Sequence, residues 1–196
     1  MAKRKRNEPT WEPVSVGVEM TTEQYLATPE TVLPTELAFG VLHVADSPTP
    51  THQLLVLALG VALNNHVKAT GAGKIWIAPL DVILDDAAHL VVQPDLFFIS
   101  NERAAIVKDR VRGAPDLAIE VLSPWPRVGD VHTRINWFAR YGVRECWLVY
   151  QPTQVIDVVQ LNEDGIGDRA RFAADEPIRS SVLPLFAESL SSMLAP

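Results

Sequence analysis

The sequence predicts an α/β fold in which a central mixed β-sheet is flanked by helices. Apolar residues recur with helical spacing in residues 51–70 and again in 130–141, and short apolar, β-branched runs lie between and after these segments. The chain has 196 residues, 47% of them hydrophobic and 21% charged, which is enough for one domain with a substantial core. We expect a disordered basic tail over residues 1–18 and a single domain over residues 19–196.

The composition argues against several classes of protein. The longest apolar run, residues 54–63, is shorter than the roughly 18 residues that a membrane helix needs. The basic N-terminus is followed by Glu8 and Pro9 instead of the apolar core of a signal peptide, so we expect a cytoplasmic protein. The single cysteine, Cys146, excludes an intrachain disulfide and a thiolate metal cage, which fits a reducing compartment.

The net charge of -7 argues against a protein that coats nucleic acid nonspecifically, because such binding depends on Lys and Arg. The charge does not exclude a nuclease, since carboxylates that hold a divalent metal ion make a site acidic. Four of the 17 basic residues lie in Lys3–Arg6, where they add solubility or weak anion binding.

The N-terminal third contains the first helix signals and a hairpin signal. Thr21 and Thr22 precede a short helix that ends before Pro29. Residues 36–44 are typical of a strand or hairpin around Gly40. The two prolines in residues 47–51 predict a loop, because proline cannot continue a regular ladder or helix.

A long core helix is predicted over residues 51–70, and Gly71 is in position to end it. Strand patterns follow, and a second helix spans residues 130–141, with Asp130 as candidate N-cap and Gly142 as candidate C-cap. The other expected elements are strands at 75–84, 90–100 and 117–122, a surface helix at 101–112, a hairpin of strands at 145–150 and 155–161, and a C-terminal packing segment from 178 with a short helix.

Two acidic residues lie inside apolar strand patterns, namely Asp95 and Glu120. A carboxylate there is costly to bury unless it is paired, hydrogen-bonded or bound to a metal ion. Strand alternation also places Asp116, Ala118 and Glu120 on one face, which would leave room for an ion. Oxygen ligands of this kind suit Mg²⁺ or Mn²⁺ and phosphodiester hydrolysis, but a strand-end Asp and a surface-paired Glu explain the spacing equally well.

A series of motifs runs from about residue 20 to the C-terminus in a characteristic order. The motifs are Thr-Glu-Leu at 35–37 with Gly40, Ser-Pro-Thr-Pro-Thr-His-Gln at 47–53, Pro-Leu-Asp-Val at 79–82, Val-Gln-Pro-Asp-Leu at 92–96, Ala-Pro-Asp-Leu-Ala-Ile-Glu-Val-Leu-Ser-Pro at 114–124 and Tyr-Gly-Val-Arg-Glu-Cys-Trp at 141–147. With these motifs the chain resembles the Uma-type (Uma2, DUF820) family of restriction-endonuclease-like proteins in the PD-(D/E)XK nuclease superfamily. The resemblance implies the restriction-endonuclease-like fold.

The resemblance also implies a set of site residues. Glu36, Asp95 and Glu120 match the acidic positions that would hold Mg²⁺ or Mn²⁺. Leu122 stands where the strand Lys of the superfamily motif would be, and Arg134 stands at the helix position where this family usually has a Lys. Lys can activate water, whereas Arg stays charged and stabilises phosphate charge or positions groups.

The implied function is metal-dependent cleavage of DNA, in which Arg134 clamps the scissile phosphate. The alternative is a nuclease-derived binding or assembly module that keeps the acids but no longer cuts. A homodimer is expected, because a duplex has two strands and symmetric dimers are the commonest oligomers.

Three further polar residues have both a functional and an ordinary interpretation. His52 matches a family His, but a helix-start histidine bonded to a nearby backbone group explains it at least as well. Asp130 matches a family position, yet its N-cap role already accounts for it. Asp81 either supports the acidic cluster or simply ends a strand. The remaining four histidines show no zinc spacing, and Cys146 is expected to be inert core.

Overall fold

The computed structural model describes residues 17–29, 33–45, 47–122 and 131–195. The helices in these ranges are α1 (Thr22–Leu26), α2 (Pro50–Thr70), the 3-10 helix η1 (Asn101–Ile106), α3 (Val131–Tyr141) and α4 (Leu190–Leu194). The strands are β1 (Thr35–Ala38), β2 (Val41–Val44), β3 (Gly73–Ile77), β4 (Val82–Asp85), β5 (Leu90–Val92), β6 (Leu96–Ser100), β7 (Val111–Arg112), β8 (Leu117–Leu122), β9 (Glu145–Tyr150), β10 (Val155–Asn162) and β11 (Gly165–Phe172).

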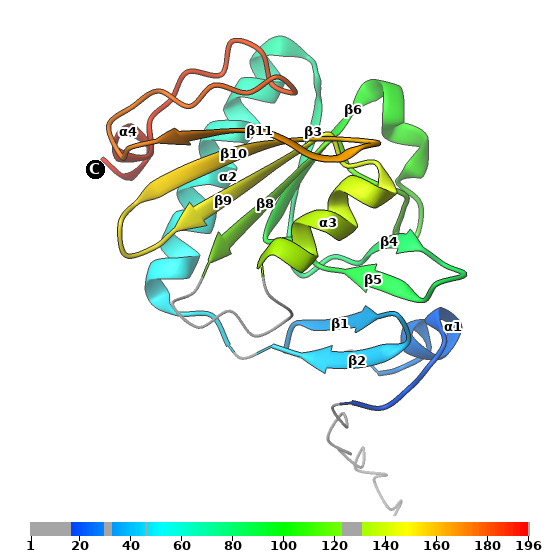
Figure 1. Ribbon diagram of the computed structural model, residues 1–196. Coiled ribbons are helices and arrows are strands. Elements are labelled where there is room, and N and C mark those ends of the chain that lie inside the picture. Colours follow the sequence, from blue (N-terminus) through cyan, green and yellow to red (C-terminus); the bar gives the residue numbers. More distant parts are fainter. Residues whose placement is uncertain (1–16, 30–32, 46, 123–130, 196) are drawn as a thin grey trace, which may run out of the picture.

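The strands form two mixed sheets. The larger has the order β11-β10-β9-β8-β6-β3, and within it only β8 and β9 run parallel. The smaller has the order β2-β1-β5-β4-β7, with β4 and β7 parallel. Figure 1 shows the larger sheet as a fan with α2 behind it and α3 in front, and the smaller sheet below it. The α/β fold with a mixed sheet flanked by helices is therefore confirmed, and the separate smaller sheet was not predicted.

The larger sheet has a core on each face. Leu117, Ile119 and Val121 of β8 pack with α2, whereas Ala118 packs on the side of α3. Side chains alternate along a strand, so the even-numbered residues of β8 point toward α3. This alternation places the Glu120 side chain on the same side of the sheet as α3.

Several local predictions are confirmed. The helices at 22–26, 50–70 and 131–141 are present, and α2 ends at Gly71 in the left-handed conformation. The hairpin of β1 and β2 turns at Phe39 and Gly40, which both have positive φ. The predicted N-cap Asp130 and the expected tail up to residue 16 lie outside the described residues. Gly17 and Val18 already hydrogen-bond with Leu42 of β2.

Residues 90–100, predicted as one strand, are divided between the two sheets. β5 belongs to the smaller sheet and β6 to the larger, and Gln93, Pro94 and Asp95 make the connection. Proline lacks the N–H that a continuous ladder requires, which favours a break here. Asp95 therefore lies at the junction of the two sheets and not within a strand.

Two further segments differ from the expectation. The helix predicted over 101–112 is a 3-10 helix at Asn101–Ile106, followed by the short strand β7. Strand β11 was not predicted, because its sequence Gly-Ile-Gly-Asp-Arg-Ala-Arg-Phe is largely polar and exposed, and only pairing with β10 defines it. Among the described residues, no helix has the length and apolar character to span a membrane.

Candidate active site

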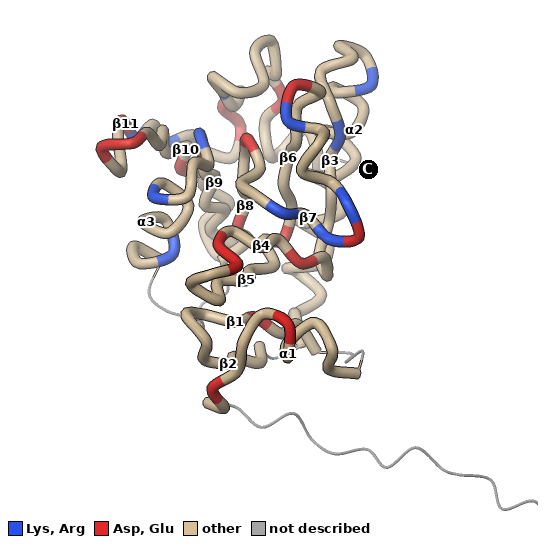
Figure 2. Tube along the Cα trace, turned by 90° about the vertical axis from the view of Figure 1, so that its right-hand side faces the viewer, with Lys and Arg blue, Asp and Glu red and all other residues tan. Residues whose placement is uncertain are grey.

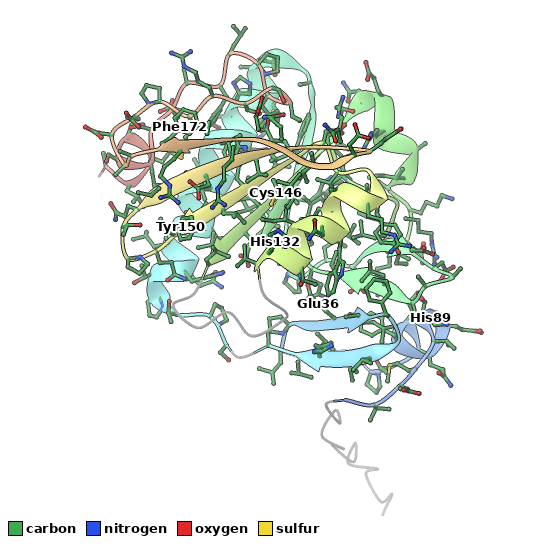
Figure 3. The ribbon with its side chains drawn as sticks, viewed as in Figure 1. Glu36, His89, His132, Cys146, Tyr150 and Phe172 are labelled. Atoms are coloured by element: carbon green, nitrogen blue, oxygen red, sulfur yellow. The ribbon has the colours of Figure 1, made fainter. Side chains whose placement is uncertain are left out.

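Four elements distant in sequence bring their functional side chains to one place between the two sheets. Glu36 comes from β1, Asp95 from the β5–β6 junction, Glu120 from β8 and Arg134 from the first turns of α3. Figure 3 shows Glu36 between the β1–β2 hairpin and the lower end of α3. The four residues inferred from the sequence motifs thus lie together, and we call them the acidic cluster.

Arg134 is the centre of the acidic cluster. Its Nη1 donates to Glu36 Oε2 and its Nη2 to Glu36 Oε1, both at 2.8 Å, while its Nε donates to Glu120 Oε1 at 2.7 Å. The exposed fractions of the side chains are 11% for Arg134, 9% for Glu36 and 14% for Glu120. A buried two-point pair of this kind fixes the guanidinium plane, because both partners are planar and forked.

Asp95 is held by two other groups. Its Oδ2 accepts a 2.7 Å hydrogen bond from the backbone N–H of Val121, the residue after Glu120. Its Oδ1 lies 3.2 Å from Nε2 of His52, and His52 Nδ1 is buried with no hydrogen-bond partner among the described residues. His52 lies in the first turn of α2, where its own backbone N–H donates to the N-cap Thr49. His52 does lie at the helix start, but its imidazole contacts the Asp95 carboxylate and not a nearby backbone group.

The two glutamates of the cluster have opposite pKa shifts. Burial, reinforced by the charges of Asp95 and Glu36 and opposed by Arg134, raises the pKa of Glu120 to about 8. Burial also acts on Glu36, but the charge and hydrogen bonds of Arg134 and the N–H of Gln93 outweigh it and lower the pKa of Glu36. Arg134 bonds to Glu36 and Glu120, and Asp95 lies outside its contacts, so the three carboxyl groups have more potential negative charge than one guanidinium neutralises.

Gln93 is a site residue that the sequence reasoning did not select. Its backbone N–H donates to Glu36 Oε1 at 2.6 Å, and its side-chain Nε2 donates to Asp81 Oδ1 at 2.8 Å. The available signal was its position immediately before Pro94 and Asp95. Gln93 therefore connects the acidic cluster to Asp81, which lies beside the cluster and not in it.

The predicted face of Asp116, Ala118 and Glu120 does not form an ion site. Asp116 accepts from the backbone N–H of Ser100 and from Arg144, at the opposite end of β8 from Glu120. Ala118 is fully buried in the core beneath α3. The predicted alternation of side chains along the strand is correct, but core side chains fill the space between the Asp116 and Glu120 carboxylates.

The three matched acids do not form a ready-made metal cage. Among the described residues, no group of three or more His, Cys, Asp or Glu side chains is arranged to hold a metal ion. Arg134 takes both Glu36 oxygens and one Glu120 oxygen. Asp95 and Glu120 nevertheless remain a two-carboxylate set beside His52, whose buried Nδ1 has no hydrogen-bond partner among the described residues. Because Mg²⁺ is bound by one or two carboxylates and completes its shell with water and substrate, this donor set fits it.

Other candidate residues have structural surroundings. His89 Nδ1 lies 3.2 Å from the backbone nitrogen of Thr22, and His132 contacts Asn136. His66 packs edge-on against Phe186. Cys146 is fully buried, and burial raises the pKa of its thiol, which makes it an unreactive core residue.

Comparison with known proteins gives matches to a protein family and to solved structures. Residues 22–192 match the Uma2 family, described as "putative restriction endonuclease". A crystal structure of a putative nuclease belonging to DUF820, from Anabaena variabilis ATCC 29413, superposes with a TM-score of 0.74 at 20% sequence identity. The match covers 89% of this chain and 97% of that one. Comparison with curated proteins gives no match.

Proposed function

Because the chain belongs to the Uma2 family of restriction-endonuclease-like proteins, we propose that it is a metal-dependent endonuclease that hydrolyses DNA phosphodiester bonds. The observation that carries the proposal is the position of Asp95 and Glu120, which come together beside Arg134 between the two sheets. Partly buried carboxylates at such a place lower the stability of a fold unless a cation or a proton compensates them. A functional site is the simplest reason to keep them there.

Asp95 and Glu120 are the proposed ligands of Mg²⁺ or Mn²⁺. When bound, such an ion lowers the pKa of a coordinated water and stabilises charge on the phosphate in the transition state. Asp95 is already oriented for this role, because Val121 N–H and His52 fix both its oxygens. Glu36, the third matched acid, accepts from Arg134 on both oxygens, so a metal ion there would compete with the charge of the guanidinium.

Arg134 has the proposed role of holding the carboxylates and receiving the scissile phosphate. A guanidinium has five N–H groups, and contacts to Glu36 and Glu120 use three of them. Each of the other two, one on Nη1 and one on Nη2, can donate to a phosphate oxygen without breaking the pair with Glu36. Arg134 does not serve as the base that activates water, because a guanidinium stays protonated.

A binding or assembly module without cleavage activity is the second candidate. The observation that favours it is the same two-point pair, since Arg134 donates to both oxygens of Glu36 and to one oxygen of Glu120. An arginine in this place stabilises the carboxylates without any metal ion. The two candidates differ in whether the protein cleaves DNA, so one assay separates them.

The test is nicking and linearisation of supercoiled plasmid by the full chain in Mg²⁺ and in Mn²⁺. We expect cleavage by the wild-type protein and loss of at least about 100-fold in rate in Asp95→Ala, because the metal ion would lose a ligand. Cleavage that survives in Asp95→Ala would come from a contaminant. A silent wild type with an active Arg134→Lys identifies a disarmed nuclease. If all three proteins are silent, the binding module is the better description.

A further inference from the structure

Two arginines of the exposed strand β11 share a single carboxylate of β10. Arg171 donates to Asp157 through Nε at 2.7 Å and through Nη2 at 2.8 Å. Arg169 donates to the same carboxylate through Nε at 3.1 Å and through Nη2. The Asp157 side chain is fully buried, whereas the side chains of Arg169 and Arg171 are 47% and 64% exposed. Solvent therefore meets the two guanidinium groups, which we call the arginine pair, and not the carboxylate.

The arginine pair has more positive charge than Asp157 compensates. One forked guanidinium is enough to bond both oxygens of a carboxylate. Here two guanidinium groups bind one carboxylate, which leaves one unit of positive charge at the surface. The hydrogen bonds of the pair to Asp157 and Tyr150 run through Nε and Nη2, so the Nη1 group of each arginine can donate to an anion.

The acids that flank the arginine pair do not reduce this charge by pairing with it. Asp168 is also on β11, but strand alternation directs its side chain to the opposite face of the sheet. Asp175 and Glu176 follow the strand, and in the part of the chain that the structure describes they form no ion pair with either arginine. The net charge of the whole chain is -7, so overall composition does not explain a positive surface here.

The register of the larger sheet places the arginine pair in line with the acidic cluster. One row of paired residues crosses four neighbouring strands and consists of Glu120, Leu148, Asp157 and Arg171. Leu148 packs in the core beneath α3, and Asp157 alternates with Ile156 and Val158 of the opposite core, so the row points to the α3 side. Strands lie about 4.8 Å apart, which puts the backbone of Arg171 about 14 Å from that of Glu120.

The arginine pair is held in place by Tyr150 as well as by Asp157. Figure 3 shows Tyr150 at the end of β9, where its hydroxyl accepts from Arg169 Nη2 at 2.9 Å. The guanidinium carbon of Arg171 lies 5.7 Å from the centre of the Tyr150 ring. Side chains that are already ordered lose less entropy when they bind a ligand. The pair is therefore a preorganised group of N–H donors.

The position of the arginine pair fits the backbone of a nucleic acid. Figure 2 shows the basic positions of β11 and of α3 on one side of the molecule, and α3 contacts β11. Each strand of a DNA duplex rises by about 3.4 Å per phosphate, so about 14 Å corresponds to roughly four nucleotides. Arginines at such a distance from a reacting phosphate contact other phosphates and fix the orientation of the duplex without reading its sequence.

We propose that Arg169 and Arg171 bind a backbone phosphate of the DNA duplex, several nucleotides from the phosphate that lies at the acidic cluster. The proposal rests on the proposed function for the position of the duplex. It assigns the arginine pair to phosphate binding through the Nη1 groups, and it assigns Asp157 and Tyr150 to holding the two guanidinium groups in place.

The test is equilibrium binding of a short labelled DNA duplex to the full chain, measured by fluorescence anisotropy in EDTA at several salt concentrations. Arg171→Gln should bind at least about tenfold more weakly than the wild type, the factor typical of one charge-assisted hydrogen bond. The slope of log affinity against log salt should become shallower by about 0.9, because one phosphate contact is lost. An unchanged affinity and slope in Arg171→Gln overturns the proposal.

Arg179→Gln is the matched control, because it removes the same charge from an exposed arginine elsewhere. Arg179 follows Ile178, which belongs to the core on the α2 side of the larger sheet. This variant should keep the affinity within about twofold of the wild type, since surface charges beyond a Debye length of about 10 Å are screened. An equal loss in Arg179→Gln and Arg171→Gln would assign the effect to net charge and overturn the proposal.

Asp157→Asn separates the charge of the arginine pair from its contribution to the fold. The substitution disturbs the same ion pairs as Arg171→Gln, but it removes a negative charge and leaves both guanidinium groups. Asp157→Asn should therefore bind the duplex more tightly than the wild type. Weaker binding by this variant would trace the loss in Arg171→Gln to a disturbed strand, which also overturns the proposal.

The plasmid assay separates this proposal from the nuclease proposal. DNA binding that depends on Arg171 without plasmid cleavage supports the phosphate contact and contradicts the endonuclease. Plasmid cleavage with the same affinity and salt slope in the wild type and Arg171→Gln supports the endonuclease and contradicts the phosphate contact.

Discussion

Glu36 and Arg134 lie 98 residues apart in sequence and form a two-point ion pair, with two N–H···O bonds of 2.8 Å each. The pair connects β1 of the smaller sheet to α3, which packs on the larger sheet. Both side chains are almost fully buried. The bond therefore contributes to the relative position of the two sheets as well as to the acidic cluster.

Glu36→Gln should destabilise the protein strongly. Removing one partner of a buried ion pair costs about 3–5 kcal/mol, and the amide oxygen that remains reduces the loss to about 2–3 kcal/mol. Urea unfolding measures the change. Glu163→Gln, in the exposed turn between β10 and β11, is the control and should change stability by less than about 0.5 kcal/mol. Equal stability of the two variants would show that the pair is energetically neutral.

Mn²⁺ should stabilise the wild-type protein against thermal unfolding. A ligand at about 100 times its Kd adds roughly 2.7 kcal/mol to the free energy of unfolding. Asp95→Asn should remove this gain, because the metal ion would lose a carboxylate. Asp109→Asn, at an exposed site before β7, should retain it.

The Glu36→Gln variant, measured in the same melting experiment, tests whether Glu36 is a third ligand of the metal ion. In the observed arrangement Arg134 takes both its oxygens, so the Mn²⁺ gain should persist. Loss of the gain in Glu36→Gln, as in Asp95→Asn, would mean that Arg134 releases Glu36 when metal binds.

Acid should destabilise the protein through Asp157 on β10, whose side chain is fully buried. Burial opposes its ionisation, but hydrogen bonds from Arg171 and Arg169 lower the pKa from 3.8 to about 2. The stabilisation is complete above the unfolded pKa and is lost as the pH falls from about 4 to about 2. The shift corresponds to about 2 kcal/mol, less whatever solvent screening of the half-exposed arginines removes.

Urea unfolding at pH 5 and at pH 2.5 measures this effect. Asp157→Asn should be less stable at pH 5 and should lose less stability on acidification than the wild type. An identical pH dependence in both proteins would assign the acid sensitivity to other carboxylates.

The expected homodimer can be tested at an apolar stripe on α2. Leu54, Leu57 and Val61 are more than half exposed, and Ile77 of the edge strand β3 lies against the same helix at Gly60. Light scattering should give twice the 21.6 kDa chain mass for the wild type and a monomer for Leu57→Glu. Leu185→Glu, at an exposed leucine outside the stripe, should remain dimeric. A monomeric wild type would contradict the prediction.

The secondary-structure predictions that the structure confirms are mostly those that depend on local sequence signals. The spacing of apolar residues and the glycine at position 71 define α2, and the turn at Gly40 defines the first hairpin. The same local signals could not show that residues 90–100 serve two sheets, because sheet membership depends on the partners of each strand and not on its own residues.

The sequence by itself indicated Asp95 and Glu120, because they are acids in apolar surroundings, and the resemblance of its motifs to a known family added Glu36 and Arg134. Only the tertiary structure decided how they pair. In the structure Arg134 bonds to Glu36 and Glu120. Asp95 contacts His52 and the backbone N–H of Val121, and Asp116 forms a separate ion pair. The hydrogen bonds between Glu36 and Arg134 join residues that are 98 positions apart in the sequence. They depend on how the two sheets and α3 pack, and no local sequence pattern encodes that packing.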